Sequence, residues 1–182
     1  MSKIGLLFGS FNPVHYGHLR IANLSVKSGV VDKVWLVPSK QNPFKESYEI
    51  SDEDRLAMVR LTTSYPFVDY CPVEFTNEVT STRTYDIYNC IKSHCSPKDS
   101  LVIICGSDMY DEIPKWYRGE ELLEEDFYIF DRDPRDISSS MIREKIKAGQ
   151  DFKEFVPEEV YNYIKENNLY VNTTEAQGIK AK

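Results

Sequence analysis

The sequence predicts a doubly wound α/β fold, in which helices flank a parallel sheet. Two observations lead to this prediction. Several short apolar runs lack polar alternation, which is typical of strands that are buried on both faces. Helical segments separate these runs, as the crossover connections between parallel strands require. Such sheets bind ligands at the carboxyl ends of their strands, so the residues that follow each strand are the first candidates for a site.

The predicted elements alternate along the chain in a Rossmann-like order. Ser51 and Asp54 form a capping box at the start of the second helix, whose apolar positions Leu56, Val59 and Leu61 suit one face. Pro72 interrupts the third strand, and Gly29 and Gly149 end two helices. The predicted strands are 3–8, 33–38, 67–75, 100–105 and 126–130, and the predicted helices are 18–29, 51–64, 84–94, 138–149 and 157–168.

Length and composition predict one soluble domain. The chain has 182 residues, of which 41% are hydrophobic and 28% charged, as in an ordinary globular protein. No apolar run approaches the ~20 residues of a membrane helix, and the first ten residues do not resemble a signal peptide. We therefore expect a cytoplasmic protein without a membrane partner. The domain is expected over 1–171, followed by a polar, disordered tail at 172–182.

The formal net charge is −7, whereas nucleic-acid-binding surfaces are usually basic. A nucleic-acid partner is therefore not expected. The net charge does not exclude an anionic small ligand, because a local cluster of side chains decides its binding.

The four cysteines predict reduced thiols and no metal site. None of them forms a C-x-x-C pair. Cys90 and Cys95 flank His94, but this spacing lacks the second pair of ligands that a zinc site of this type needs. Cys71 and Cys105 lie in apolar runs and are expected to be small core residues.

The junction between the first strand and the first helix combines turn residues with two of the three histidines. In "FGSFNPVHYGHLRIANL", residues 8–24, Gly9 and Gly17 permit a tight turn or a ligand close to the backbone. The helix N-terminus directs its free N–H groups at the loop, and His15 and His18 can face the same space. We expect a site that binds phosphate and acts by charge stabilisation and positioning, rather than a turn with two structural histidines.

"GSFNPVHYGH" resembles the phosphate-binding signature of nucleotidyltransferases that carry an H-x-G-H motif. Those enzymes pair it with a late helix start that is rich in Ser or Thr and followed by Arg, as in "ISSSMIR" at 137–143. Three further segments, "VPSKQNPFK", "ICGSDMYDEIPKWYRGEELL" and "FKEFVPEEVYNYIKENNLY", resemble the nicotinate-nucleotide adenylyltransferases. The resemblance covers residues 3 to about 170. It implies transfer of AMP from ATP to nicotinate mononucleotide, which releases pyrophosphate and forms deamido-NAD in NAD biosynthesis.

The sequence departs from the family pattern at two places. Only "RDPRD", at 132–136, stands where the family usually has a longer segment with an extra strand. Ser140 replaces the family's commoner threonine but keeps the hydroxyl group.

The resemblance implies that the mononucleotide phosphate attacks the α-phosphorus of ATP directly, with Mg²⁺ held mainly by phosphate oxygens and water. It implies that His18, His15 and Arg143 are catalytic, with His18 stabilising the transition state. Asp108 would accept hydrogen bonds from the adenosine ribose, and Trp116 would stack on the pyridine ring. The implied ATP-binding residues are Gly9, Ser10, Phe11, His15, His18, Gly106, Asp108, Arg132, Ser139, Ser140 and Arg143, and the implied mononucleotide-binding residues are Asn12, Lys45, Thr84, Tyr85 and Trp116.

Several alternatives remain open. Arg143 could be a solvated helix charge, Asp108 a helix N-cap, Trp116 a core residue and Lys45 a surface lysine. The mononucleotide could carry nicotinamide, which differs only by an amide. Phosphopantetheine adenylyltransferases share both phosphate motifs but would not need "IPKWYR". A non-catalytic nucleotide sensor would be expected to lose His18 or Arg143. The sequence leaves a homo-oligomer open.

Overall fold

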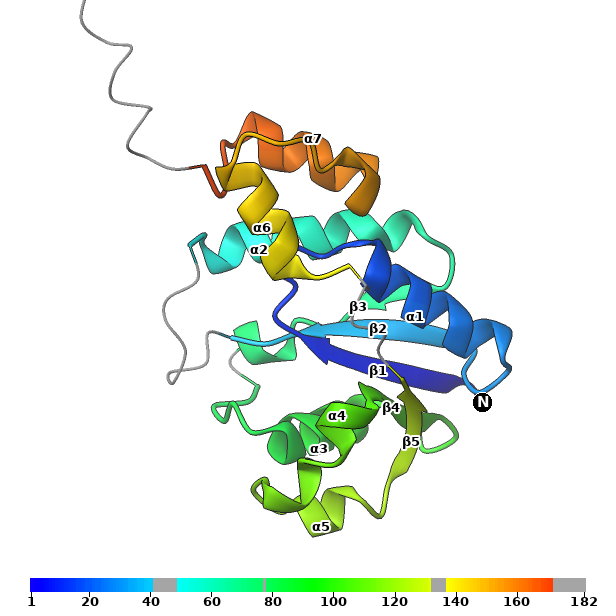
Figure 1. The fold of residues 1–182 in the computed structure, drawn as a ribbon. Helices are drawn as coiled ribbons and strands as arrows, with labels where there is room; N and C mark the ends of the chain where they lie inside the picture. Colours follow the sequence, from blue (N-terminus) through cyan, green and yellow to red (C-terminus); the bar gives the residue numbers. More distant parts are fainter. Residues whose placement is uncertain (41–48, 77, 132–136, 172–182) are drawn as a thin grey trace, which may run out of the picture.

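The computed structural model describes residues 1–40, 49–76, 78–131 and 137–171 (Figure 1). Within these ranges, five strands form one sheet in the order β3-β2-β1-β4-β5, and every neighbouring pair is parallel. The predicted doubly wound parallel sheet is therefore confirmed. The strands are β1 (Lys3–Gly9), β2 (Lys33–Pro38), β3 (Val68–Tyr70), β4 (Ser100–Gly106) and β5 (Asp126–Phe130).

The third strand is much shorter than the predicted 67–75. It ends at Tyr70, and a 3-10 turn, η2 (Val73–Phe75), takes up the rest of the segment. Pro72 stands between the two elements and has no N–H group for the ladder. The last ladder bond of β3 therefore comes from the Cys71 N–H group, which donates to the Leu36 carbonyl oxygen at 2.8 Å.

The five predicted helices are present, with two short ones added. The Ser51 hydroxyl accepts the N–H of Asp54 at 3.0 Å, so the predicted cap is confirmed. The first helix begins at Tyr16, two residues earlier than predicted, because His15 is its N-cap. The helices are α1 (Tyr16–Lys27), α2 (Asp52–Leu61), α3 (Thr84–His94), α4 (Ser107–Tyr110), α5 (Gly119–Leu122), α6 (Ser139–Lys147) and α7 (Glu158–Glu166), with 3-10 turns η1 (Thr62–Ser64), η3 (Ile113–Lys115) and η4 (Lys153–Phe155).

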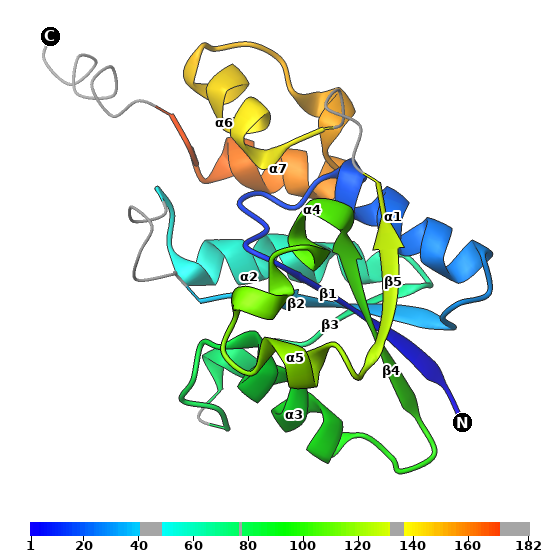
Figure 2. The same ribbon diagram turned by 60° about the horizontal axis from the view of Figure 1, so that its bottom comes forward.

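Helices cover both faces of the sheet (Figures 1 and 2). α1, α2, α6 and α7 lie on one face, and α3 and α5 lie on the other. Successive residues of β4 point alternately into the two layers: Val102 and Ile104 belong to one core cluster, and Leu101 and Ile103 to the other. The strand is thus buried on both faces, as its continuous apolar run predicts.

The chain reverses its direction of winding between β1 and β4. β1 lies between β2 and β4, so the connections that leave the carboxyl ends of β1 and β4 diverge there. Gly9 and Gly106 are the last residues of these two strands. A ligand site is expected at such a point of reversal. No helix in the described part of the chain is long and apolar enough to cross a membrane.

Candidate active site

The loop between β1 and α1 is tightly packed. Phe11 has a φ of 47° and is 1% exposed, so its ring is turned into the protein. A Cβ atom on Gly9 would lie 3.1 Å from that ring, and one on Gly17 would lie 2.8 Å from the His15 ring. Glycine is therefore needed at both positions to let the loop's own rings pack closely. The peptide bond between Asn12 and Pro13 is cis.

The two histidine rings stack on each other at the start of α1. Their centroids are 3.7 Å apart, and Phe11 meets the His18 ring edge-on at 4.8 Å. The His15 N–H group donates to Nδ1 of His18 at 3.2 Å. Because Nδ1 accepts this bond, the neutral His18 ring carries its proton on Nε2. The arrangement makes Nε2–H the hydrogen-bond donor with which His18 can meet an anion.

The second motif docks directly on the first. Ser138 caps α6 by accepting the Met141 N–H at 3.2 Å, and the next hydroxyl, Ser139 Oγ, donates to the carbonyl oxygen of Pro13 at 2.9 Å. Arg143 Nη1 donates to the Asn12 carbonyl oxygen at 2.7 Å. Its Nη2 lies 3.3 Å from Ser140 Oγ. The N-terminus of α6, two hydroxyl groups and a guanidinium therefore lie against the histidine loop.

A buried arginine supports the same loop from α2. The Arg55 side chain is fully buried, and its Nη1 donates to the carbonyl oxygens of Ser10, at 2.7 Å, and Ser39, at 2.8 Å. Its Nη2 pairs with the Asp52 carboxylate. The Ser39 N–H group donates to the Gly9 carbonyl oxygen at 2.9 Å. Arg55 thereby joins the ends of β1 and β2.

The C-terminal part of the chain also reaches the loop. Tyr170 is 4% exposed, and its hydroxyl group donates to Oδ1 of Asn12 at 2.7 Å. Burial raises the pKa of the Tyr170 hydroxyl, so it remains a donor at neutral pH.

A cavity of about 340 Å³ opens beside the loop at the carboxyl edge of the sheet. Gly9 and Cys105 contribute its floor from β1 and β4, and Thr84 comes from the start of α3. Trp116, directly after η3, adds an aromatic wall, and Glu74 adds a carboxyl group. The dimensions and the mixture of apolar and polar groups suit a small organic ligand.

Comparisons with known proteins place the chain in a family. A model of the cytidylyltransferase-like family matches residues 6–145. The chain is 32% identical to the nicotinate-nucleotide adenylyltransferase of Bacillus subtilis (strain 168), over 93% of this chain and 99% of that protein. The chain belongs to the nicotinate-nucleotide adenylyltransferase family. The resemblance stated from the sequence is confirmed.

Solved structures support the same fold. Plasmodium falciparum nicotinic acid mononucleotide adenylyltransferase complexed with NaAD has a TM-score of 0.75 at 21% identity, covering 93% of this chain and 98% of that one. The same enzyme complexed with APC has a TM-score of 0.69 at 20% identity, with the same coverage of both chains. Nucleotidyltransferases of this family generally use a divalent metal with ATP.

The structure brings most of the predicted phosphate-binding residues together. Gly9, Ser10, Phe11, His15 and His18 lie between the end of β1 and the first turn of α1, and the start of α6 with Ser139, Ser140 and Arg143 lies against this segment. Arg132 and Lys45 lie outside the described residues, as does the predicted tail at 172–182.

Some of the residues predicted to contact the adenosine and the mononucleotide line the cavity, whereas Gly106, Asp108 and Asn12 are not among its lining residues. Gly106 is the N-cap of α4, and Asp108 lies in its first turn, so Asp108 is not a helix N-cap. Thr84 and Trp116 line the cavity, and Trp116 is only partly buried against the second core cluster. Tyr85 is not among the cavity residues, and its hydroxyl donates to Glu121 Oε2 at 3.2 Å. Asn12 already has partners for its carbonyl oxygen and its side-chain oxygen.

Sequence reasoning missed Arg55, Glu74 and Tyr170. The buried side chains of α2 are Arg55, Met58 and Val59, so the predicted face, which included Leu56 and Leu61, is rotated from the real one. The spacing of Arg55, three positions before Met58, places the two side chains on the same face of the helix and was the available signal. The charge of Arg55 argued against burial and concealed this signal. Nothing near Glu74 or Tyr170 in the sequence indicates their partners.

Proposed function

We propose that this chain transfers the adenylyl group of ATP to nicotinate mononucleotide, with release of pyrophosphate and formation of deamido-NAD. One observation carries the proposal. The helix start at Ser139–Arg143 bonds to Asn12 and Pro13, just before His15 and His18, and a cavity with an aromatic wall opens at the end of β1. The phosphate groups of ATP would bind between the two motifs, and the pyridine end of the acceptor would occupy the cavity.

The residues around the loop provide charge stabilisation and orientation. Neither motif presents an evident general base, so the acceptor phosphate would itself be the nucleophile, held in line with the α-phosphorus. His18 Nε2–H would donate to the oxygens on which negative charge develops as pyrophosphate leaves. Arg143, Ser140 and the N-terminus of α6 would bind the leaving phosphates.

The donor set fits a magnesium ion that arrives with ATP. Among the described residues, the only cluster of three metal-ligating side chains is Glu78, Cys90 and His94, and none of these residues belongs to the loop or to the cavity wall. Mg²⁺ retains several waters and binds readily through phosphate oxygens, so it needs no carboxylate cage from the protein. When bound, it would neutralise phosphate charge, while His18 and Arg143 orient the same oxygens.

The cavity supports the choice of a pyridine mononucleotide as acceptor. Trp116 offers a flat face against which a heterocycle can stack, and Thr84 offers a hydroxyl group at the edge of the same space. Nicotinate, rather than nicotinamide, follows from the name of the Bacillus subtilis relative.

A pyrophosphate-release assay tests the proposal. Protein, ATP and Mg²⁺ are mixed with nicotinate mononucleotide, nicotinamide mononucleotide or 4′-phosphopantetheine in separate reactions. The expected result is pyrophosphate and deamido-NAD with the first acceptor at the highest kcat/KM. Preference for nicotinamide mononucleotide would change the substrate, and adenylylation of phosphopantetheine alone would overturn the assignment. Absence of turnover with every acceptor, with ATP still bound, would make the protein a nucleotide sensor.

We assign the reaction to the cytoplasm on the basis of the thiols. Cys71, Cys90, Cys95 and Cys105, all in the described part of the chain, are free cysteines. Unpaired thiols suit a reducing compartment.

A further inference from the structure

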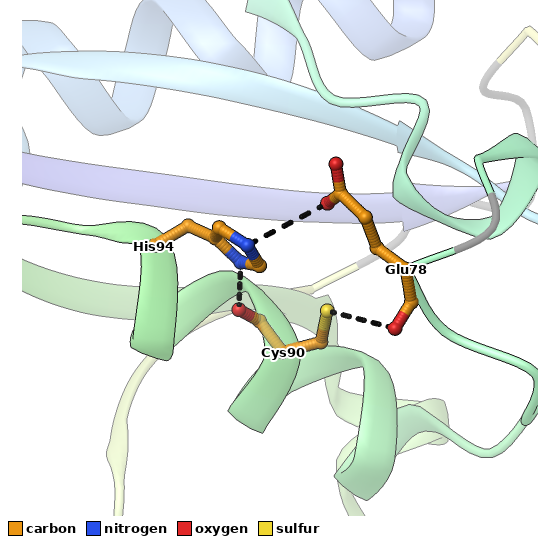
Figure 3. A group of neighbouring side chains, drawn as sticks. All are labelled: Glu78, Cys90 and His94. Carbon is orange, nitrogen blue, oxygen red and sulfur yellow. Dashed lines mark hydrogen bonds and ion pairs between the residues drawn. The ribbon is translucent and has the colours of Figure 1, made fainter.

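Away from the nucleotide site, three side chains capable of binding metal converge on the surface of α3 (Figure 3). Cys90 and His94 are four residues apart on the helix, so they lie one turn above each other on the same face. Glu78 comes from the loop between η2 and α3, which passes beside that face. One ligand atom from each residue lies within 4.8 Å of the other two.

The hydrogen bonds orient the imidazole for coordination. His94 Nδ1 lies 2.8 Å from the Cys90 carbonyl oxygen, which can only accept, so Nδ1 carries the proton in the neutral ring. The lone pair is then on Nε2, which faces Glu78 Oε2 at 3.8 Å. A carbonyl oxygen that holds the second nitrogen of a ligating histidine is a common arrangement around protein-bound metals.

We propose that Glu78, Cys90 and His94 bind a zinc-class divalent cation, with a fourth coordination position open to water or a small ligand. A thiolate, an imidazole and a carboxylate suit Zn²⁺ or Co²⁺, whereas Mg²⁺ and Ca²⁺ prefer oxygen ligands alone. Near Cys90 and Cys95, the sequence contains no second pair of ligands of the zinc-finger type. The third ligand instead comes from a loop residue twelve positions before Cys90.

The side chains can close around an ion without moving the backbone far. Metal-to-ligand distances of ~2.0–2.3 Å place tetrahedral ligand atoms roughly 3.3–3.8 Å apart. In the structure the three ligand atoms lie within 4.8 Å of one another, so they would have to move somewhat closer together. The side chains of Glu78 and His94 are 54% and 59% exposed, so both have room to adjust. Their exposure also leaves an open entry path for the ion.

An ion at this position would fasten the loop residues 78–83 to α3. The loop already contacts the helix through Ser81 Oγ, which donates to Asp86 Oδ2 at 2.6 Å, and through the Cys90 thiol, whose Sγ lies 4.0 Å from the Glu78 carbonyl oxygen. Thr82 in this loop and Thr84 at the start of α3 both line the cavity. Bound metal would therefore restrain one wall of the cavity from outside.

The experiment uses the full-length, tag-free protein stripped of metal with a chelator. Zn²⁺ is titrated in competition with a chromophoric chelator, and Co²⁺ is added to look for an absorption band from cobalt–thiolate charge transfer. We expect one ion per chain, a cobalt–thiolate band and a higher melting temperature with Zn²⁺. Cys90→Ser and His94→Ala should each lower the Zn²⁺ affinity by at least ~10-fold, and Cys90→Ser should abolish the band.

Cys95→Ser is the matched control, because Cys95 is a neighbouring, partly buried thiol outside the proposed ligand set. It should retain the wild-type affinity and the cobalt band. Equal loss of binding in Cys95→Ser and Cys90→Ser would show that the ligand set is wrong. Absence of zinc binding in the wild type, or binding unchanged in both Cys90→Ser and His94→Ala, would reduce the cluster to an ion pair between His94 and Glu78. Melting temperatures measured without metal show that each variant is folded.

Discussion

Arg143 Nη1 donates a hydrogen bond to the Asn12 carbonyl oxygen at 2.7 Å, across 131 positions of sequence. The guanidinium has five N–H groups, so this bond fixes its position while other donors remain available for phosphate. Arg143 thus holds the histidine loop and, in the proposed function, presents positive charge to ATP.

Replacement of Arg143 by Lys should separate these contributions. Lysine keeps the charge but lacks the planar fork that reaches both Asn12 and a phosphate group. We expect Arg143→Lys to raise the KM for ATP by about tenfold and Arg143→Ala to raise it further, since charge-assisted hydrogen bonds contribute ~1.5–3 kcal/mol. Steady-state kinetics with ATP varied provide the measurement. Lys145→Ala, on the same helix, is the control, and equal KM values for Arg143→Ala and wild type would refute the assignment.

His18→Ala should lower kcat much more than it weakens ATP binding. An imidazole donor that meets developing charge acts mainly in the transition state, and loss of such a donor typically costs ~100-fold or more in kcat. Single-turnover rates and ATP dissociation constants measured on the same preparation distinguish the two effects. Lys27→Ala, at the other end of α1, serves as the control. A kcat close to that of the wild type would remove His18 from the mechanism.

Trp116→Ala should weaken the mononucleotide and spare ATP. Stacking on an aromatic side chain contributes roughly 1–3 kcal/mol, so the KM for the mononucleotide should rise by roughly tenfold or more. Trp116→Phe should recover much of the loss, because it restores a flat ring. If Trp116 acts only through packing against its core cluster, both KM values should rise together and the melting temperature should fall in proportion.

Tyr170→Phe tests the support of the loop from the C-terminal part of the chain. The substitution leaves the buried Oδ1 of Asn12 without its hydroxyl donor, which should lower the free energy of unfolding by ~1–3 kcal/mol. Denaturant unfolding provides the measurement. Tyr163→Phe is the matched control, because its hydroxyl donates to the more accessible Asp54 at 3.0 Å, where water can replace it. Equal stability of the two variants would contradict the proposed support.

Glu74 should make stability depend on pH. Its carboxyl group is 3% exposed, and burial raises its pKa from 4.5 to about 7, against the opposing hydrogen bond from the Lys40 N–H and the charges of Lys40 and Arg55. The folded state therefore retains a proton that the unfolded chain has released. The contribution of Glu74 to the free energy of unfolding should fall as pH rises from 4.5 to 7 and stay constant above that range.

Glu74→Gln removes this titration but keeps an oxygen that can accept the Lys40 N–H bond, now 3.0 Å long. As pH rises from 4.5 to 7, the wild type should lose free energy of unfolding that the variant keeps. The difference in free energy of unfolding, variant minus wild type, should therefore increase by up to about 3 kcal/mol over this range. Thermal or denaturant unfolding at several pH values measures the difference. Parallel pH curves for the two proteins would show that the carboxyl group titrates normally.

The periodic parts of the fold could be predicted well from the sequence. The bounds of α3 and β5 agree with those predicted, since each is a clear helical or apolar run between turn residues. The strand-to-helix junction at His15 and the helix start at Ser139 were also located from the sequence, because the turn and capping residues of each are close together along the chain. β3 was predicted too long because apolar character continues past Pro72 into a 3-10 turn.

The contacts between the motifs could not be predicted, because they join residues far apart in sequence. Arg55 reads as a surface charge on an acidic helix start, yet tertiary packing places it in the interior beside three carbonyl or carboxylate partners. Tyr170 lies beyond the last helix, where local patterns predict only the end of the domain. These hydrogen-bond partners are determined by the tertiary fold, and a pattern of neighbouring residues in the sequence does not specify them.

The links from Asn12 to Arg143 and Tyr170 have a consequence for the order in which the protein matures. A ribosome makes the loop between β1 and α1 before strands β2 to β5, and all five described strands of the sheet are made by Phe130. The two partners of Asn12 leave the ribosome only afterwards. A nascent chain that ends after β5 could thus pair all five described strands and still lack the restraints on Asn12, so the site is completed only after Tyr170 has been made.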